Sequence, residues 1–196
     1  RQEVIAGGGE GAPLAVYGVY LLFSKKGEDR IMLNIGGIAN FTFLPGSADS
    51  KKVFVTDTGP GNTLIDQAVQ QHKPGTYFDK DSNIAKRGKV NDRFLGELLT
   101  DKFFELPFPK TTGPELFNMH YVRRALERCD ATSLSLEDLL ATLTRFSAVT
   151  IVNAILKAVK IKNGSKIFLS GGGAHNPLLL QGIKSLLPGA DFHSMD

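Results

Sequence analysis

The chain has 196 residues, of which 42% are apolar and 22% are charged, and its formal net charge is +3. This is the composition of an ordinary globular domain, and the uninterrupted apolar stretches are much shorter than the roughly 20 residues of a membrane-spanning helix. The basic residues are scattered along the chain rather than gathered with aromatic residues on one face, which argues against a nucleic-acid-binding surface. We therefore expect neither a membrane nor a nucleic acid as a partner.

The single cysteine, Cys129, excludes an internal disulfide and favours a reducing, cytoplasmic location. It lies at a charged helix end with no activating motif around it, so we expect a structural role. The chain begins at Arg1 rather than at Met and ends abruptly after a strand-like stretch at residues 190–193. We expect the full protein to extend beyond both ends.

The predicted elements begin with an apolar helix at residues 14–23, entered through Pro13. Three short strands follow at residues 30–34, 38–44 and 52–56, close enough together to form an antiparallel meander. The rest of the chain alternates helices with one further strand, which makes it a mixed α/β domain. The expected helices are residues 63–72, 91–99, 120–129, 135–159 and 177–187, and the strand is residues 166–170.

The first motif that could carry chemistry is Asp-Thr-Gly-Pro-Gly-Asn at residues 57–62, between a strand and a helix. Its glycines would let the backbone approach a ligand, and free amides at a helix start attract anions. Asp57 could hold Mg²⁺, because hard cations prefer oxygen ligands. The competing interpretation is a tight turn with an aspartate cap, and we favour the phosphate site.

The second motif is a run of three glycines, residues 171–173, directly after an apolar strand. A flat surface without side chains could receive an adenine or a ribose. A helix cap explains Asn176 and Pro177 but does not explain three glycines, each of which costs folding entropy, so we favour a ligand site. The sequence shows no activating motif around His175, which is expected to be structural or to support a ligand contact indirectly.

Three further segments leave a structural and a functional interpretation open. Asn34 and Asn40 flank a glycine turn that is either a plain hairpin corner or a sugar contact. Residues 110–118 offer Lys110, Thr111, Thr112 and Glu115 in an irregular segment, where they could contact a substrate, although Thr112 and Glu115 could equally cap the next helix. The glycine-rich residues 7–14 form either a loop near a ligand or a linker.

Two common nucleotide motifs are absent from the sequence. No Gly-x-Gly-x-x-Gly follows a strand, and there is no Gly-x-x-x-x-Gly-Lys-[Ser/Thr]. A P-loop kinase is therefore not expected.

Taken together and in this order, residues 34–40, 57–62, 110–118 and 171–176 resemble the anhydro-N-acetylmuramic acid kinase family. Residues 8–14, Gly-Gly-Glu-Gly-Ala-Pro-Leu, are similar to the family's Gly-Gly-Gln-Gly-Ala-Pro-Leu, with Glu10 in place of the glutamine. The resemblance covers essentially the whole chain. It places the family in the superfamily of sugar kinases, heat-shock ATPases and actin, and implies that residues 1–196 are the second, C-terminal lobe of a two-lobed enzyme with an actin-like, ribonuclease H-like fold.

The resemblance implies an ATP- and Mg²⁺-dependent kinase that opens the ring of 1,6-anhydro-N-acetylmuramic acid and phosphorylates O6, giving N-acetylmuramic acid 6-phosphate in peptidoglycan recycling. It also suggests a homodimer. Residues 57–62 would be the second phosphate loop and residues 171–173 the adenosine motif. The implied nucleotide ligands are Asp57, Thr58, Gly59, Gly61, Asn62, Gly171, Gly172, Gly173 and Asn176. The implied sugar contacts are Glu10, Asn34, Lys110, Thr111, Thr112 and Glu115, and Asp57 is the implied metal ligand.

The family's general base is an aspartate in an Asp-Phe-Arg stretch just before the glycine-rich run. Arg1 matches the arginine of that stretch, so the base is expected upstream of this chain, and so is the first phosphate loop. The segment alone is therefore expected to be inactive. Two alternatives stay open: a kinase for another amino sugar such as N-acetylglucosamine, and a non-catalytic nucleotide-binding module.

Overall fold

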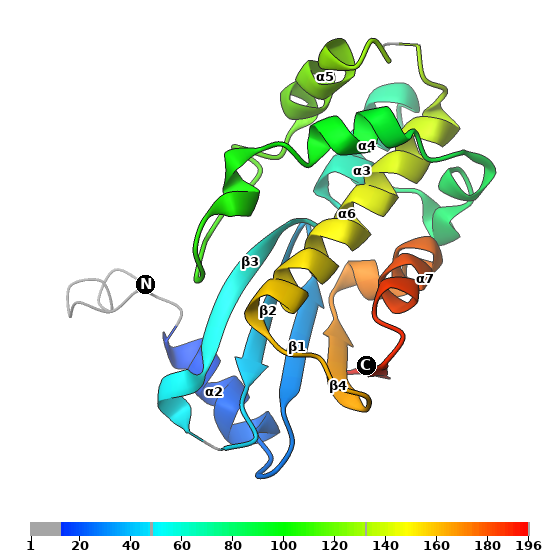
Figure 1. Ribbon diagram of the computed structural model, residues 1–196. Coiled ribbons are helices and arrows are strands. Elements are labelled where there is room, and N and C mark those ends of the chain that lie inside the picture. The colour runs from blue at the N-terminus through cyan, green and yellow to red at the C-terminus, as the bar shows by residue number, and fades with distance from the viewer. Residues whose placement is uncertain (1–12, 48, 132, 196) are drawn as a thin grey trace.

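A computed structural model of the protein describes residues 13–47, 49–131 and 133–195 (Figure 1). The strands are β1 (Arg30–Ile35), β2 (Ile38–Leu44), β3 (Phe54–Pro60), β4 (Ser165–Ser170) and β5 (Ala190–Ser194). The α-helices are α2 (Pro13–Phe23), α3 (Thr63–His72), α4 (Asp92–Leu98), α5 (Met119–Arg128), α6 (Leu136–Ala158) and α7 (Pro177–Leu186). The predicted order of helices and strands is confirmed.

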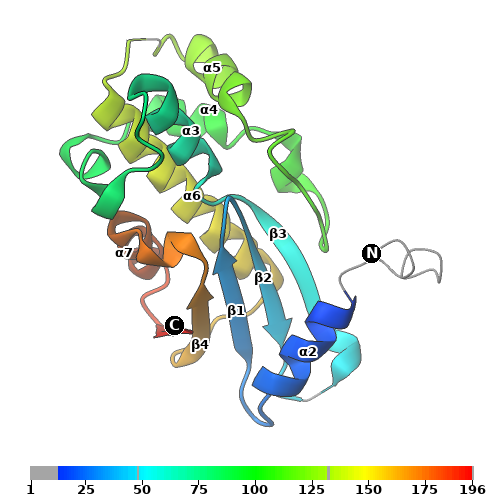
Figure 2. The same cartoon turned by 180° about the vertical axis from the view of Figure 1, so that it is seen from behind.

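The strands form one mixed sheet in the order β3-β2-β1-β4-β5. β1, β2 and β3 pair antiparallel as the predicted meander, whereas β4 runs parallel to β1 and β5 parallel to β4. Figures 1 and 2 show α6 and α7 on one face of the sheet and α2 on the other. This arrangement brings the ends of β1 and β4 and the start of α3 to the same end of the sheet.

Two hydrophobic clusters form the interior, and α6 belongs to both. One cluster lies among the helices and contains Phe94, Phe117 and Phe146, and the other lies between the sheet and α6 with α7 and contains Phe41 and Ile151. Among the described helices only α6 is long and apolar enough to cross a membrane. Because 78% of its most apolar stretch is buried inside the protein, α6 is a helix of the protein core.

Side-chain caps fix where the helices begin. Asn176 is the predicted cap of α7, and it accepts a hydrogen bond from an amide in the first turn of its helix, as Asn91 does for α4 and Ser135 for α6. The suggested capping pair of Thr112 and Glu115 is wrong, because α5 begins only at Met119. Its cap is Asn118, whose Oδ1 accepts from the amide of His120 at 2.9 Å.

β3 is longer than predicted, because the prediction ended this strand at residue 56 and placed Asp57 directly after it, in the motif between the strand and the helix. The strand continues to residue 60, with Asp57 paired to Asn40 of β2. The physical reason is a neighbour on its outer side, because the Asp57 amide donates to the Lys110 carbonyl at 2.9 Å and the Lys110 amide donates to Thr56 Oγ1 at 3.0 Å. Asp57 is therefore held at a fixed place in the sheet.

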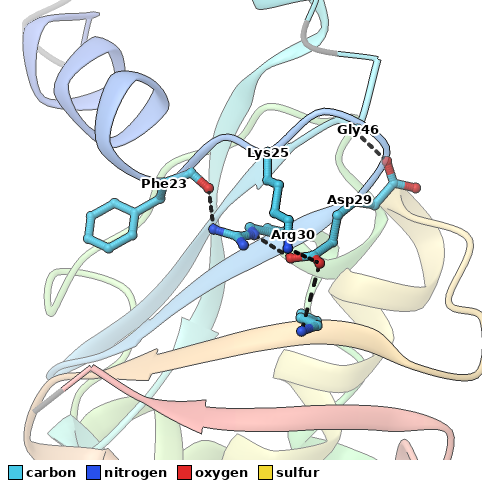
Figure 3. A network of polar contacts seen from close by, with 7 residues as sticks. Phe23, Lys25, Asp29, Arg30 and Gly46 are labelled. Atoms are coloured by element: carbon cyan, nitrogen blue, oxygen red, sulfur yellow. Dashed lines mark hydrogen bonds and ion pairs between the residues drawn. The ribbon is translucent and has the colours of Figure 1, made fainter.

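A charged network joins α2 to the sheet at the start of β1 (Figure 3). Arg30 donates to the Phe23 carbonyl at 2.8 Å and to Glu28 at 2.6 Å. Glu28 also faces Lys25 at 3.3 Å and Lys166 of β4 at 3.7 Å. The network lies at the end of β1 away from the turn to β2, so it organises the fold without entering the site described below.

The two-cluster core makes a prediction for α6. Phe146 is fully buried and packs its ring against Phe104, Phe117 and Tyr121, with centroids 5.8, 6.5 and 6.2 Å away. Phe146→Ala should lower the free energy of unfolding by about 3–5 kcal/mol, the usual cost of emptying such a site. Leu156→Ala, on the same helix but 52% exposed, should change it by less than about 0.5 kcal/mol. Denaturant unfolding of both variants checks this, and equal losses would contradict it.

Candidate functional site

Three glycine turns meet at one end of the sheet. They are the β1–β2 turn, the link between β3 and α3, and residues 171–173 between β4 and α7. The backbone contacts are close: the Gly61 amide donates to the Gly37 carbonyl at 2.8 Å, and a Cβ on Gly173 would lie 2.2 Å from Ile35 Cγ2. The end of β1 is therefore the common support of all three turns.

The amides at the start of α3 are already hydrogen-bonded, which corrects the expectation that they are free for an anion. The amides of Gly61 and Thr63 donate to the Gly37 carbonyl at 2.8 and 3.0 Å, and the Asn62 amide donates to the Gly36 carbonyl at 2.9 Å. From α6, the Ser147 hydroxyl donates to the Gly61 carbonyl at 2.8 Å. A ligand at this loop would contact other atoms, such as the Asn62 side chain.

Packing explains two of the three glycines in the turn after β4. Gly171 has a φ of +85°, and a Cβ there would lie 2.7 Å from the Ile35 carbonyl oxygen. Gly173 has no room because of the Ile35 side chain. Gly172 is different, since its nearest neighbour would be Asn62 Nδ2 at 3.8 Å. Of these three glycines, only Gly172 leaves open space that a ligand could occupy.

A cavity of about 600 Å³ opens beside Gly172, between α3, the start of α7 and the segment at residues 77–81. Of the predicted nucleotide residues it contains Asn62, Gly172 and Asn176, which come from both glycine motifs. Its lining residues are Asn62, Ile65, Asp66, Gln70, Tyr77, Phe78, Asp79, Lys80, Asp81, Gly172, His175 and Asn176. The structure does not place Asp57, Thr58, Gly59, Gly61, Gly171 or Gly173 in this wall.

One wall of the cavity is a polar stripe along α3. Asn62, Asp66 and Gln70 are spaced four residues apart and so share one side of the helix, away from the buried Leu64 and Ala68. Burial raises the pKa of Asp66 from 3.8 to about 6. Sequence reasoning missed Asp66 and Gln70, although the interval of four residues from Asn62 could have indicated them.

The opposite wall is residues 77–81, at the start of a segment for which the sequence predicts neither helix nor strand. The Asp79 carboxylate accepts the amides of Ile84 and Ala85, both at 2.8 Å, and so folds the segment back on itself. The Ser82 hydroxyl then donates to Asn176 Oδ1 at 2.6 Å, which attaches the segment to the start of α7. No sequence motif indicated this wall, because the hydrogen bonds that attach it to α7 join residues more than 90 positions apart in the chain.

A row of polar side chains crosses the sheet near the glycine turns. Asp57, Asn40, Asn34 and Ser170 are register partners on β3, β2, β1 and β4, all partly exposed. Paired residues project to one face, and Ser170 Oγ donates to Asn34 Oδ1 at 3.4 Å. The predicted metal ligand and the predicted sugar contact on β1 therefore lie on the same face of the sheet.

Residues 110–115 lie beside Asp57. The Thr112 amide donates to Asp57 Oδ2 at 2.8 Å. Burial raises the pKa of Asp57, the Thr112 hydrogen bond opposes this, and the nearby Glu115 carboxylate adds to the rise. Thr111 and Glu115 are exposed, whereas the Thr112 hydroxyl is buried with no hydrogen-bond partner among the described residues. The segment thus offers groups to a ligand next to Asp57.

Two predicted ligands have their side chains engaged within the fold. Lys110 is 7% exposed; its ammonium donates to the Phe103 carbonyl at 2.8 Å and lies 4.3 Å from the centre of the Phe103 ring. Burial lowers the pKa of Lys110, and the nearby Lys157 lowers it further. Thr58 is fully buried and donates to the Ala39 carbonyl at 3.1 Å. Both side chains therefore hold the backbone around them in place, and we do not expect either of them to contact a ligand directly.

Asp57 is suited to a shared rather than a complete metal site. Within the described residues no three His, Cys, Asp or Glu side chains lie close enough together to hold a metal. One Asp57 oxygen accepts the Thr112 amide, so the other can serve a cation. Mg²⁺ is commonly held by one or two carboxylates with phosphate oxygens and water, so a single carboxylate fits this ion. Glu10, the remaining predicted contact, lies outside the described residues.

The packing of the glycine turn predicts very different effects on stability for two neighbouring substitutions. Gly173→Ala should lower the free energy of unfolding by several kcal/mol, because its methyl group meets Ile35 at 2.2 Å. Gly172→Ala should leave stability nearly unchanged, because nothing lies closer than 3.8 Å. Denaturant unfolding measures the difference, and a Gly172 variant as unstable as the Gly173 variant would contradict this account of the turn.

The burial of Asp66 predicts a pH-dependent gain from its removal. A carboxyl group whose pKa rises on folding favours the folded state when protonated, and this contribution is lost as the pH rises from about 4 through about 6. Asp66→Asn should therefore be more stable than the unsubstituted protein at pH 8, by roughly 1 kcal/mol because solvent screens this half-buried group, and nearly equally stable at pH 4. Thermal unfolding without nucleotide at the two pH values tests this. An equal difference at both would contradict it.

Comparisons with known proteins agree with these observations. The family model for anhydro-N-acetylmuramic acid kinase matches residues 1–196. Curated proteins of that name from Pseudoalteromonas atlantica and Caldanaerobacter subterraneus are 54% and 41% identical to the chain, each over 96% of its length. These alignments cover 47% and 48% of the two relatives, so the chain spans about half the length of the curated relatives it matches.

A solved structure supports the fold. The activator of the 2-hydroxyisocaproyl-CoA dehydratase from Clostridium difficile, with bound ADPNP, matches with a TM-score of 0.55 and 11% sequence identity. The match covers 93% of this chain and 59% of that one. This likeness confirms the expected actin-like ATPase fold. Because the family model matches the chain from its first residue to its last, the chain belongs to the anhydro-N-acetylmuramic acid kinase family.

Proposed function

We propose that the protein uses ATP to open and phosphorylate 1,6-anhydro-N-acetylmuramic acid in the cytoplasm, giving N-acetylmuramic acid 6-phosphate in peptidoglycan recycling. The observation that carries this proposal is the meeting of both glycine motifs at one cavity, in a chain that matches the kinase family over residues 1–196. This chain would supply the second lobe, with nucleotide contacts and part of the sugar contacts.

The nucleoside would occupy the cavity beside Gly172. Tyr77 and Phe78 line it and are 74% and 57% exposed, so they offer apolar surface on which a base could stack. Asn62 and Asn176 lie at the glycine end, toward which the phosphates would point. The structural neighbour with bound ADPNP supports a nucleotide in this fold.

Asp57 would hold Mg²⁺ through the carboxylate oxygen that Thr112 does not use. The nucleotide and Mg²⁺ together supply a transferable phosphoryl group and neutralise its charge. Because Asp57 sits in a strand bonded on both sides, at Asn40 and at Lys110, its position needs little adjustment on binding. This preorganisation is what electrostatic catalysis requires.

The sugar would lie across the polar row near Asp57. Asn34 can donate and accept hydrogen bonds, and Thr111, Thr112 and Glu115 border Asp57 on the other side. Glu10 remains a predicted contact from the family resemblance. We assign Lys110 a positioning role, since its ammonium already contacts Phe103.

The proposed reaction balances as a hydration followed by transfer. A water hydroxyl would add to C1 as the C1–O6 bond breaks, O6 would take the γ-phosphoryl group of ATP with ADP as the leaving group, and the water proton would pass to a general base. The family resemblance puts that base, an aspartate, upstream of Arg1. The residues of this chain would orient the sugar and the phosphates and leave the proton transfer to that aspartate.

The decisive test is a coupled assay of ADP formation with the protein from its complete gene. Anhydro-N-acetylmuramic acid should be turned over and N-acetylglucosamine should not. Asp57→Asn keeps an acceptor for the Thr112 amide but removes the charge, so turnover should fall by roughly 10²-fold or more while the melting temperature is retained.

Asp191→Asn is the matched control, because Asp191 is an exposed acid on β5, where it is the backbone register partner of Lys166 near the other end of the sheet. It should keep full activity. Turnover of N-acetylglucosamine alone would favour the other-kinase alternative, and nucleotide binding without turnover of either sugar would favour a binding module. The homodimer suggested by the resemblance stays a prediction, which light scattering on the same sample tests.

A further inference from the structure

The Asp66 carboxylate lies in the cavity wall without a partner. No hydrogen bond or ion pair to its oxygens occurs among the described residues, although Lys80 also lines the cavity. The group is partly buried, and desolvation is the cause of its raised pKa. A buried carboxylate is costly unless donors compensate it, so a ligand that brings donors would stabilise this one.

The position of Asp66 along α3 indicates which donors. Asn62, one turn earlier, lies beside Gly172 at the glycine end of the cavity. Gln70, one turn later, donates to the Tyr77 carbonyl at 3.0 Å, at the aromatic end. Since each turn is about 5.4 Å, Asp66 faces the middle of a ligand that extends from one end to the other.

In a nucleotide that points its phosphates toward the glycine turns and its base toward Tyr77 and Phe78, the middle is the ribose. Its vicinal 2′- and 3′-hydroxyls are two adjacent donors, which match the two oxygens of a carboxylate. Another nucleotide-binding fold, the dinucleotide-binding one, uses an acidic side chain on the ribose hydroxyl for the same physical reason.

We propose that Asp66 is the ribose-reading residue of the cavity and accepts hydrogen bonds from both vicinal hydroxyls of the bound nucleotide. This rests on the proposed nucleotide site and adds a basis for preferring ribonucleotides. It also gives the polar stripe on α3 a division of roles, with Asn62 toward the phosphates, Asp66 on the sugar and Gln70 holding the aromatic segment.

The test compares ATP with 2′,3′-dideoxy-ATP by calorimetric binding to the protein from its complete gene. The unsubstituted protein should bind the dideoxy compound roughly 10- to 100-fold more weakly, the usual worth of hydrogen bonds to a charged group. Asp66→Ala should weaken ATP binding by a similar factor and leave the affinity for the dideoxy compound almost unchanged. Gln71→Ala, an exposed site on the same helix, should keep the full preference.

A variant at Asp66 that retains the preference for ATP over 2′,3′-dideoxy-ATP would overturn the proposal while leaving the nucleotide site intact. Inosine triphosphate distinguishes the base: a change at Asp66 that alters only the ratio of ATP to inosine triphosphate would place the residue on the adenine amine and overturn the ribose assignment. Failure of the unsubstituted protein to bind ATP at all would instead contradict the proposed function.

Discussion

The close approach of three glycine turns to the end of β1 is the constraint on which the site depends. Carbonyl oxygens of the β1–β2 turn accept three successive amides from the start of α3, and Ile35 fills the space beneath Gly171 and Gly173. Side chains at these points would push α3 and α7 apart. Because both helices start at the same strand end, Asn62 and Gly172 lie side by side at the glycine end of the cavity.

Much of this fold could be predicted from the sequence because its signals are local. Asn91, Ser135 and Asn176 each cap the helix that follows them. The helical spacing of apolar residues predicts α6 over its whole length. The extent of β3 was not, because the residues from Asp57 onward look like a turn until Lys110 is known to lie beside them. Local strand propensity cannot indicate a hydrogen bond between residues more than 50 positions apart in the sequence.

In the candidate site, too, local motifs could be predicted from the sequence and long-range packing could not. The two glycine motifs were recognisable, and the structure brings Asn62, Gly172 and Asn176 to one cavity. The reasons given for the glycines were only partly right, since packing rather than ligand access accounts for Gly171 and Gly173. The role of Lys110 could not be predicted from its residue type alone. Its ammonium lies against the rings of Phe103 and Phe108, which precede it in the chain.

The bond between Ser82 and Asn176 has a consequence for cooperativity. Asn176 Oδ1 accepts from the Leu179 amide within α7 and from the Ser82 hydroxyl of the neighbouring segment. Asn176 Oδ1 therefore both caps α7 and holds the segment at residues 77–85 against the start of that helix. Opening of the segment at residues 77–85 and fraying of the first turn of α7 are coupled through it, so this segment and the start of α7 should open and close as one unit.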